Sequence, residues 1–262
     1  MASGGSAAAG RAARRWPFAA APLPAPDRPV YAIGDVNGCA AMLYDLLGRI
    51  DADIERRCLD DAVILCTGGM IDRGPDPAEV ALSLMSLDRL APGGVICLAG
   101  APERGLLAAI DDPGQSMRRW IAAGGAATLR SFGVDGAEER RPGDIAASLR
   151  AAMPAGMEDW LRGLPLIWRS GSVVAVHAGL DPGRPPEGQV VAPLRGHPRF
   201  GLRSRPDGLW VVHGGRILPE GRIFRGHVGV ATGAFAGGPL TAAHVGRDGG
   251  VAFLATPPAR RA

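Results

Sequence analysis

Five short polar turns in this sequence carry residue types that bind metals and phosphates. They are Gly34 to Gly38, Gly68 to Gly74, Gly100 to Glu103, His177 to Gly179 and His213 to Gly215. Carboxylate, amide and imidazole groups are metal ligands, and an arginine such as Arg73 binds phosphate through two parallel hydrogen bonds. The turns therefore predict a site for a metal, a phosphate or both.

Each turn follows a short apolar segment that the pattern predicts to be a strand. After the first turn, apolar residues from Cys39 to Ile50 recur at helical spacing. Predicted strands at residues 62–67 and 94–99 repeat the order of strand, polar turn and helix. The helix that follows the strand at 62–67 is expected at 77–90. Three such units in a row predict a parallel sheet, whose strand ends meet at one edge and place the turns side by side.

The rest of the chain predicts a covering layer and a second sheet. Residues 113–165 are mostly helical in pattern, with core anchors listed here: Trp120, Leu129, Leu149, Met153, Trp160 and Leu161. From residue 173 onward, short strands are expected at 173–176, 209–212, 228–232, 240–245 and 251–254. The expected fold class is α/β, with four layers in which two mixed β-sheets lie face to face and are flanked by helices.

Composition divides the chain into a body and two tails. Residues 1–28 are rich in Ala, Pro and Arg and predict a disordered tail, residues 29–256 one domain, and residues 257–262 a short C-terminal tail. Arg14-Arg15 before Phe18 is faintly similar to a twin-arginine export signal, but four prolines nearby favour a plain tail.

Charge and cysteine usage narrow the possible partners and the compartment. The net charge of +3 arises within residues 1–28, so the body is neutral and no nucleic-acid partner is expected. No apolar run is long enough to span a bilayer, so no membrane partner is expected either. The four cysteines lack Cys-x-x-Cys spacing and predict free thiols, Cys66 and Cys97 within strands, which is typical of the cytoplasm.

Taken in order, the five turns resemble the motifs of one family. They are similar to those of the bacterial and phage-type serine/threonine protein phosphatases, a branch of the calcineurin-like metallophosphoesterase superfamily that also holds symmetrical diadenosine tetraphosphatases. The family motifs read Gly-Asp-x-His-Gly, Gly-Asp-x-Val-Asp-Arg-Gly, Gly-Asn-His-Glu, His-Ala-Gly and His-Gly-His. The resemblance extends from about Val30 to Leu254 and implies the metallophosphoesterase fold.

The resemblance also implies a mechanism, and this sequence departs from its residues. In active relatives two divalent metals (manganese, iron or zinc) activate a water that attacks phosphorus, and a histidine protonates the leaving oxygen. Asp35, His177 and Glu103 match the family motifs, while Asn37 replaces a ligand histidine. Residues without side-chain donors stand at the other positions: Gly69, Ala101 and Gly215 at ligand positions, and Pro102 at the proton donor.

This residue set predicts loss of the metal centre. Asp35, Asn37 and His177 form an incomplete ligand set that would hold at most one weakly bound metal, so no cofactor is expected. No catalytic group is intact, because Pro102 has no side-chain proton to donate. Asp35 and His177 are instead expected to bond to each other at the edge of the sheet.

The arginines and the remaining histidines have competing interpretations. Arg73 matches the family's phosphate-binding arginine, and the alternative is that Asp72 and Arg73 only stabilise their turn. Arg195 is a looser match to a second phosphate-binding arginine, and an isolated surface arginine is the favoured alternative. Arg216 would supply positive charge near the lost metal, and a solvated loop arginine is the favoured alternative. For the histidines, His213 is expected to pack in its turn, with His197 and His244 in solvent.

The sequence therefore favours a catalytically inactive phosphatase-like protein, a pseudophosphatase that serves as a binding or regulatory module. Its expected partner is a phosphorylated ligand or another protein. The alternative is a weak metal-dependent phosphoesterase that hydrolyses phosphoprotein or dinucleoside polyphosphate substrates.

Overall fold

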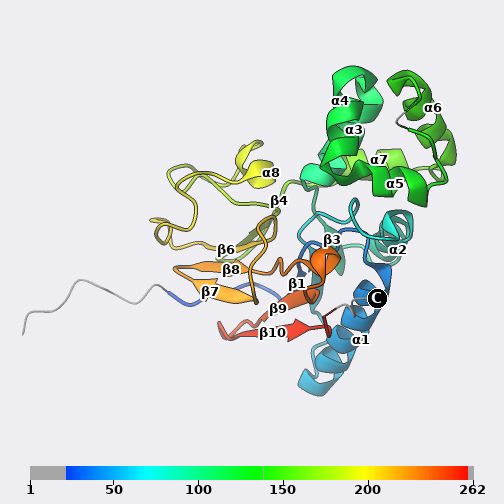
Figure 1. The fold of residues 1–262 in the computed structure, drawn as a ribbon. Helices are drawn as coiled ribbons and strands as arrows, with labels where there is room; N and C mark the ends of the chain where they lie inside the picture. Colours follow the sequence, from blue (N-terminus) through cyan, green and yellow to red (C-terminus); the bar gives the residue numbers. More distant parts are fainter. Residues whose placement is uncertain (1–21, 138, 259–262) are drawn as a thin grey trace, which may run out of the picture.

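The computed structural model describes residues 22–137 and 139–258 of the 262-residue chain, and Figure 1 shows its course. The strands are β1 Val30–Ile33, β2 Val63–Cys66, β3 Val95–Cys97, β4 Ile167–Ser170, β5 Val173–Val176, β6 Trp210–His213, β7 Arg222–Phe224, β8 His227–Gly229, β9 Thr241–Val245 and β10 Val251–Ala255. The helices are α1 Ala40–Arg57, α2 Pro77–Leu90, α3 Ala101–Asp111, α4 Pro113–Trp120, α5 Ala126–Ser131, α6 Pro142–Ala152, α7 Met157–Gly163 and α8 Ala192–Arg195. A π-helical turn (η1, Ile121–Gly125) and a 3-10 turn (η2, Ala234–Ala236) complete the elements.

The first sheet has the strand order β10-β9-β1-β2-β3. β1, β2 and β3 pair in parallel, as the three strand-turn-helix units predicted, and β9 runs antiparallel to β1. The sequence pattern assigned β9 and β10 to the second sheet, and this assignment is wrong. The 3-10 turn after β8 carries the chain back, so that both strands extend the first sheet beside β1.

The second sheet has the order β4-β5-β6-β8-β7. β5, β6 and β8 are parallel, while β4 and β7 pair antiparallel at the two edges, so this sheet is mixed as well. The edge strands β4 and β7 were not predicted. β7 is exposed along its whole length, so it has no buried alternation for a pattern to reveal.

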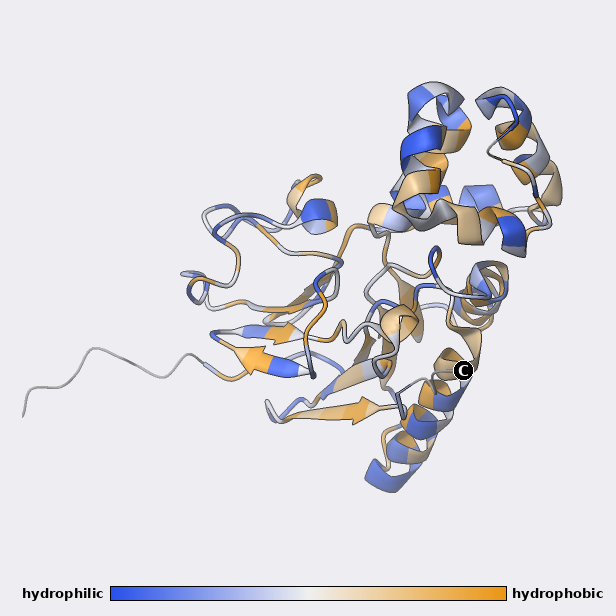
Figure 2. Ribbon diagram, in the orientation of Figure 1, coloured by the Kyte–Doolittle hydropathy of each residue, from blue (hydrophilic) through white to orange (hydrophobic). Residues whose placement is uncertain are grey.

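Alternating residues of β1 supply two different cores. Val30 and Ala32 face the second sheet in an apolar layer with Val173 and Val212, whereas Tyr31 and Ile33 belong to the core beneath the helices. Figure 2 shows the same division, with hydrophobic residues in the strands and on the inner sides of the helices. The two mixed sheets therefore lie face to face, as predicted.

The outer layers differ between the two sheets. α1 and α2 lie beside the first sheet, and α3 to α7 form a helical group above it (Figure 1). The outer side of the second sheet carries the segment from β5 to β6, in which α8 has only four residues. Loops, rather than long helices, thus make up much of the fourth layer.

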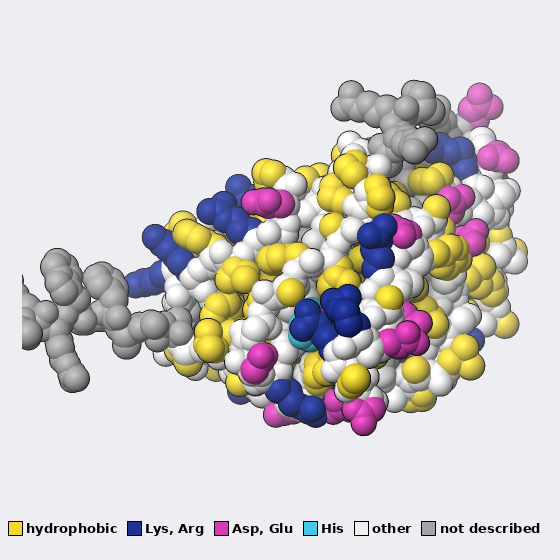
Figure 3. Space-filling view, turned by 90° about the horizontal axis from the view of Figure 1, so that it is seen from below, with side chains coloured by type: hydrophobic (Ala, Val, Ile, Leu, Met, Phe, Trp, Pro, Cys, Tyr) yellow, Lys and Arg dark blue, Asp and Glu magenta, His cyan; other side chains and the backbone are white. Residues whose placement is uncertain are grey.

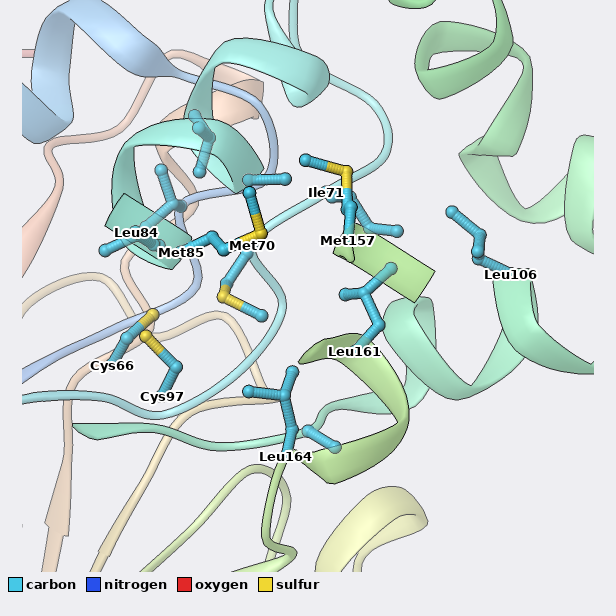
Figure 4. Close-up of a cluster of buried hydrophobic side chains, with 14 of the residues drawn as sticks. Cys66, Met70, Ile71, Leu84, Met85, Cys97, Leu106, Met157, Leu161 and Leu164 are labelled. Atoms are coloured by element: carbon cyan, nitrogen blue, oxygen red, sulfur yellow. The ribbon is translucent and has the colours of Figure 1, made fainter. Parts of the chain in front are cut away.

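The predicted helical segment 113–165 anchors the loop that follows β2. Figure 4 shows Met70 and Ile71 of that loop among side chains from α2, α3 and α7, including Met85, Leu106 and Met157. Five of the six predicted anchors are buried, and Trp160 is partly buried. This packing holds the second polar turn in a fixed position at the sheet edge.

The folded body begins earlier than the boundary at residue 29 expected from composition. Pro22 accepts a 2.6 Å hydrogen bond from the Trp210 indole, and Asp27 accepts one of 2.8 Å from the Gly171 backbone N–H. Residues 22–28 thus pack along the second sheet. Residues 1–21 and 259–262, where most of the two predicted tails fall, lie outside the described residues.

Acidic and basic side chains are interspersed over the face shown in Figure 3.

Within residues 22–137 and 139–258, none of the helices combines the length and the hydrophobicity that a bilayer crossing requires. All four cysteines are free: Cys39, Cys66 and Cys97 are buried, and Cys58 at the end of α1 is exposed.

Candidate functional site

The turns after β1, β2, β3, β5 and β6 meet at one edge of the two sheets. Between them lies a cavity of about 430 Å³, which we call the rim cavity. It is lined by Asp35, Asn37, Asp72, Arg73, Ala101, Pro102, Gly105, Ala108, Ser116, Arg119, Trp120, Ala123, His177, Ala178, Leu194, Arg195 and Gly215. Nearly all the residues predicted from the sequence motifs therefore line one cavity.

Asp35 and His177 approach each other without forming the expected hydrogen bond. The His177 Nδ1 lies 3.8 Å from the Asp35 Oδ1, and Nδ1 is buried with no hydrogen-bond partner among the described residues. Asp35 accepts a 2.9 Å bond from the Gly215 backbone N–H instead. Burial raises the pKa of Asp35, an effect that His177 and the Gly215 N–H partly oppose.

Asn37 is turned toward the backbone. Its Nδ2 donates a 3.2 Å hydrogen bond to the Ile71 carbonyl, and its φ of 44° belongs to the left-handed region that asparagine tolerates better than most residues. The residue is 2% exposed. Asn37 thus links the first and second polar turns.

Gly69 and Gly215 stand where the family motifs have metal ligands, and their backbone conformations suit glycine. Gly69 has φ +67°, and a Cβ there would lie 3.0 Å from the Asp35 Cγ and 3.1 Å from the His177 Cε1. Gly215 has φ +71°, and a Cβ there would lie 2.9 Å from the Ala178 Cα. Side chains at either position require the surrounding turn to move.

Glu103, the retained member of the third motif, holds the second turn together. Its 0%-exposed carboxylate accepts hydrogen bonds from the backbone N–H groups of Gly69, Met70 and Ile71 at 3.1, 2.8 and 3.3 Å. It also reaches back to the Gly100 N–H at 2.7 Å, at the start of α3. Glu103 is therefore a structural group in this chain.

Asp72 is held by residues of the helical segment. Its carboxylate accepts hydrogen bonds from the Trp120 indole N–H at 3.2 Å and from the Thr128 hydroxyl at 2.7 Å. Burial raises the pKa of Asp72 to about 7, although these two hydrogen bonds oppose the rise. The turn-stabilising interpretation is thus supported for Asp72.

Arg73 is exposed and lines the rim cavity. Its guanidinium carbon lies 4.9 Å from the centroid of the Phe235 ring, which orients the head group through a cation–π contact. The backbone N–H of Arg73 donates to the Gly124 carbonyl at 3.1 Å. Arg73 therefore leaves its guanidinium available while its backbone is fixed.

Arg195 and Arg119 also line the rim cavity, whereas Arg216 does not. Arg195 is the last residue of α8. Arg119 lies on α4, and its guanidinium donates a 2.7 Å hydrogen bond to the Gln115 side chain. Arg216 is exposed and lines a neighbouring cavity, which favours its interpretation as a solvated loop arginine over a replacement for metal charge. Arg119, Trp120 and Phe235 were not identified as site residues, since no polar turn contains them.

The other histidines are mostly enclosed. His213 donates through Nδ1 to its neighbouring Gly214 carbonyl at 3.0 Å, as a turn-packing residue does. His244 was expected in solvent but is 6% exposed, because it is the cross-strand partner of Tyr31 beneath α1. His197 is partly buried and lies 3.9 Å from Asp181.

The residues present do not fit the two-metal centre of the family. Among the described residues, no group of three or more His, Cys, Asp or Glu side chains is placed to hold a metal ion. Asn37 is hydrogen-bonded to backbone, and Gly69 and Gly215 have no donors. Pro102 starts α3 at a position where it has no proton to give.

Solved structures decide the fold. A candidate diadenosine tetraphosphatase matches 89% of this chain and 96% of its own with a TM-score of 0.59 at 20% identity. A serine/threonine protein phosphatase from Saccharomyces cerevisiae matches 90% and 82% with a TM-score of 0.55 at 15% identity. A metallophosphoesterase from Sphaerobacter thermophilus matches 88% and 89% with a TM-score of 0.52 at 14% identity.

The chain has the metallophosphoesterase fold. This is the fold that the resemblance of the five turns implied. In sequence, a symmetrical bis(5'-nucleosyl)-tetraphosphatase from Methylococcus capsulatus is 32% identical over 154 residues, which are 58% of this chain and 44% of that protein. The match thus spans less than half of the relative's length. No known family profile matches the chain.

Proposed function

We propose that this chain is a catalytically inactive metallophosphoesterase-fold protein that binds a phosphorylated ligand in the rim cavity without a metal. The observation that carries the proposal is the content of the cavity. Three arginines line it, Arg73, Arg119 and Arg195, while the family's ligand positions hold Gly69, Ala101 and Gly215. A phosphate can thus be bound by guanidinium groups where active relatives use metal ions.

The acids in the cavity do not offset its positive charge fully. Among the described residues, Asp35 and Asp72 are the only carboxylates in its lining, and burial raises the pKa of both, to about 7 for Asp72. Asp72 is also occupied by Trp120 and Thr128. Near neutral pH the cavity lining is therefore net positive, which favours a dianionic phosphate.

Loss of turnover follows from two independent parts of the site. A two-metal mechanism needs ligands that place both ions against one phosphate, and the described residues contain no group of three or more His, Cys, Asp or Glu side chains that could hold even one ion. It also needs a proton for the leaving oxygen, and Pro102 stands where the family has its histidine. Restoring either part alone would leave the other missing.

The test is phosphate binding by calorimetry in the presence of EDTA, with inorganic phosphate and a phosphoserine peptide as probes. The wild-type chain should bind both, and Arg73→Ala and Arg195→Ala should each weaken binding by about tenfold, the loss expected for one charge-assisted contact. Arg118→Ala is the matched control, because Arg118 precedes Arg119 in α4 but does not line the cavity. Equal affinity in all four proteins would refute the proposal.

One comparison favours a second function. The Methylococcus capsulatus relative is a symmetrical bis(5'-nucleosyl)-tetraphosphatase, so a weak metal-dependent phosphoesterase acting on phosphoprotein or dinucleoside polyphosphate substrates is the alternative. Asp35 and His177 would then share one rearranged metal. Tight stoichiometric manganese together with aryl phosphate turnover that Asp35→Ala abolishes would establish the alternative and exclude the inactive form.

A cytoplasmic location is part of the proposal. Free cysteines throughout the chain, one of them exposed at Cys58, support a reducing compartment. A protein partner that carries the phosphate is compatible with the open position of Arg73 and Arg195.

A further inference from the structure

A second cavity of about 310 Å³, which we call the aromatic cavity, lies beside the rim cavity, with Ala178 in the lining of both. It is formed by the loop before β6, the end of β6 and the strands β7 and β8. Its lining consists of Ala178, Phe200, Gly201, Leu202, His213, Arg216, Leu218, Arg222, Phe224, His227 and Gly229. Ala178 and His213 belong to the fourth and fifth polar turns, but the proposed function does not use this cavity.

Three rings are packed edge to face in its wall. The Phe200 ring centroid lies 4.9 Å from that of His213 and 4.5 Å from that of His227, with interplanar angles of 83° and 74°. A glycine makes room for this arrangement, because a Cβ at Gly179 would lie 2.8 Å from the Phe200 Cδ1. The rings therefore form a fixed surface suited to contact with another flat ring.

The two histidines present acceptors rather than charges. His213 donates through Nδ1 to Gly214, and burial lowers its pKa to about 4, so at neutral pH its Nε2 carries a free lone pair. His227 donates through Nε2 to the Arg203 carbonyl at 3.4 Å, and burial lowers its pKa also. Its Nδ1 has no hydrogen-bond partner among the described residues and is buried away from solvent, so His213 rather than His227 offers the acceptor to a ligand.

The charged residues of the cavity are all basic. Arg216 and Arg222 line it, and no aspartate or glutamate of the described part of the chain does. Arg222 and Arg225 both lie against the Phe224 ring, at 5.1 and 4.9 Å from its centroid. The opening thus favours an anionic group. A metal ion is disfavoured, since His213 and His227 are the only metal-binding side chains that residues 22–137 and 139–258 contribute to the lining.

From this lining we infer that the aromatic cavity binds a planar aromatic anion whose ring carries an N–H or O–H donor. The ring would pack against Phe200, the donor would bond to the His213 Nε2, and the anionic group would lie at Arg216 and Arg222. This assignment does not depend on phosphate binding in the rim cavity.

The test is calorimetric binding of three carboxylates that lose one property at a time. Indole-3-carboxylate has an aromatic ring, a donor and a charge. 1-Methylindole-3-carboxylate lacks the donor, and cyclohexanecarboxylate lacks both the donor and the aromatic ring. We expect indole-3-carboxylate to bind saturably, the methylated compound at least fivefold more weakly, and cyclohexanecarboxylate not measurably. Equal affinity for all three, or no saturable binding of any up to 10 mM (about the weakest range such a titration covers), would overturn the assignment.

Variants locate the bound ring. His213→Phe keeps a ring and removes the acceptor, so it should erase the preference for indole-3-carboxylate over its methylated form, and Arg222→Ala should weaken both. Arg118→Ala is the control, and thermal denaturation verifies that each variant is folded. An affinity that is unchanged in His213→Phe and Arg222→Ala, or abolished by saturating inorganic phosphate in the wild-type chain, would place the ligand elsewhere and refute the inference.

Discussion

A Cβ added to Gly69 would lie 3.0 Å from the Cγ of Asp35. The two residues lie in the turns after the neighbouring strands β1 and β2, at the positions that the motif resemblance assigns to two metal-binding aspartates. In this chain the space between them is closed, and the His177 ring lies on its other side, 3.1 Å from the same added atom. A side chain at residue 69 would therefore have to displace Asp35 or His177.

Gly69→Asp is therefore expected to destabilise the protein without creating a metal site. A non-glycine residue at φ +67° and a second carboxylate beside Asp35 should together lower the free energy of unfolding by about 1–3 kcal/mol. Urea denaturation measures the loss, and manganese titration should show no stoichiometric binding. Gly143→Asp in the first turn of α6, where an added Cβ meets nothing within 4 Å, is the control and should be near neutral. Tight manganese in Gly69→Asp would contradict the closed geometry.

Glu103→Gln is expected to be among the most destabilising single changes at the site. The carboxylate accepts four backbone N–H bonds while fully buried, and an amide would turn a donor toward some of them. A loss of about 2–4 kcal/mol in the free energy of unfolding is expected for unpaired buried groups. The exposed Glu55→Gln on α1 serves as the control and should change stability by less than about 0.5 kcal/mol. A Glu103→Gln protein as stable as the wild type would show that the bonds are dispensable.

Asp72 makes the stability of the wild-type chain fall as pH rises. Its folded pKa of about 7 lies above its unfolded value, so between about pH 4 and 7 the folded state binds more protons and the free energy of unfolding decreases with pH. Asp72→Asn keeps an oxygen for Trp120 and Thr128 and removes the titration. The variant should gain stability relative to the wild type between pH 5 and 8, by roughly 4 kcal/mol at most.

The measurement is urea denaturation of both proteins at several pH values, so that other titrating groups such as Asp35 cancel in the difference. Asp60→Asn, at an exposed residue, should run parallel to the wild type. A constant difference between Asp72→Asn and the wild type from pH 5 to 8 would mean that Asp72 is ionised throughout.

The sequence predicted the positions of the site better than the contacts within it. Polar turns that follow apolar strands place Asp35, Arg73 and His177 at the edge formed by the carboxyl ends of the strands, because neighbouring parallel strands have their carboxyl ends on the same side of a sheet. Pairing partners are a different matter. β9 and β10 are short, largely apolar segments like several strands of the second sheet, and such a segment does not indicate which sheet it joins.

The sequence pattern also did not predict the direction in which individual side chains point. His244 reads as an isolated polar residue in the sequence, yet its register with Tyr31 buries it under α1. Asn37 stands at a ligand position, but the left-handed turn directs its amide to the Ile71 carbonyl. Such outcomes depend on long-range packing, which a linear pattern does not contain.

Phe235→Leu is expected to weaken phosphate binding although Phe235 does not line the rim cavity. The ring orients the Arg73 guanidinium from 4.9 Å, and a cation–π contact of about 0.5–1 kcal/mol corresponds to a two- to fivefold change in Kd. Calorimetry with inorganic phosphate in EDTA measures the change. Phe253→Leu on β10 is the matched control and should bind like the wild type. The effect should vanish when Arg73 is already alanine, and additive losses in the double variant would show that Phe235 acts by another route.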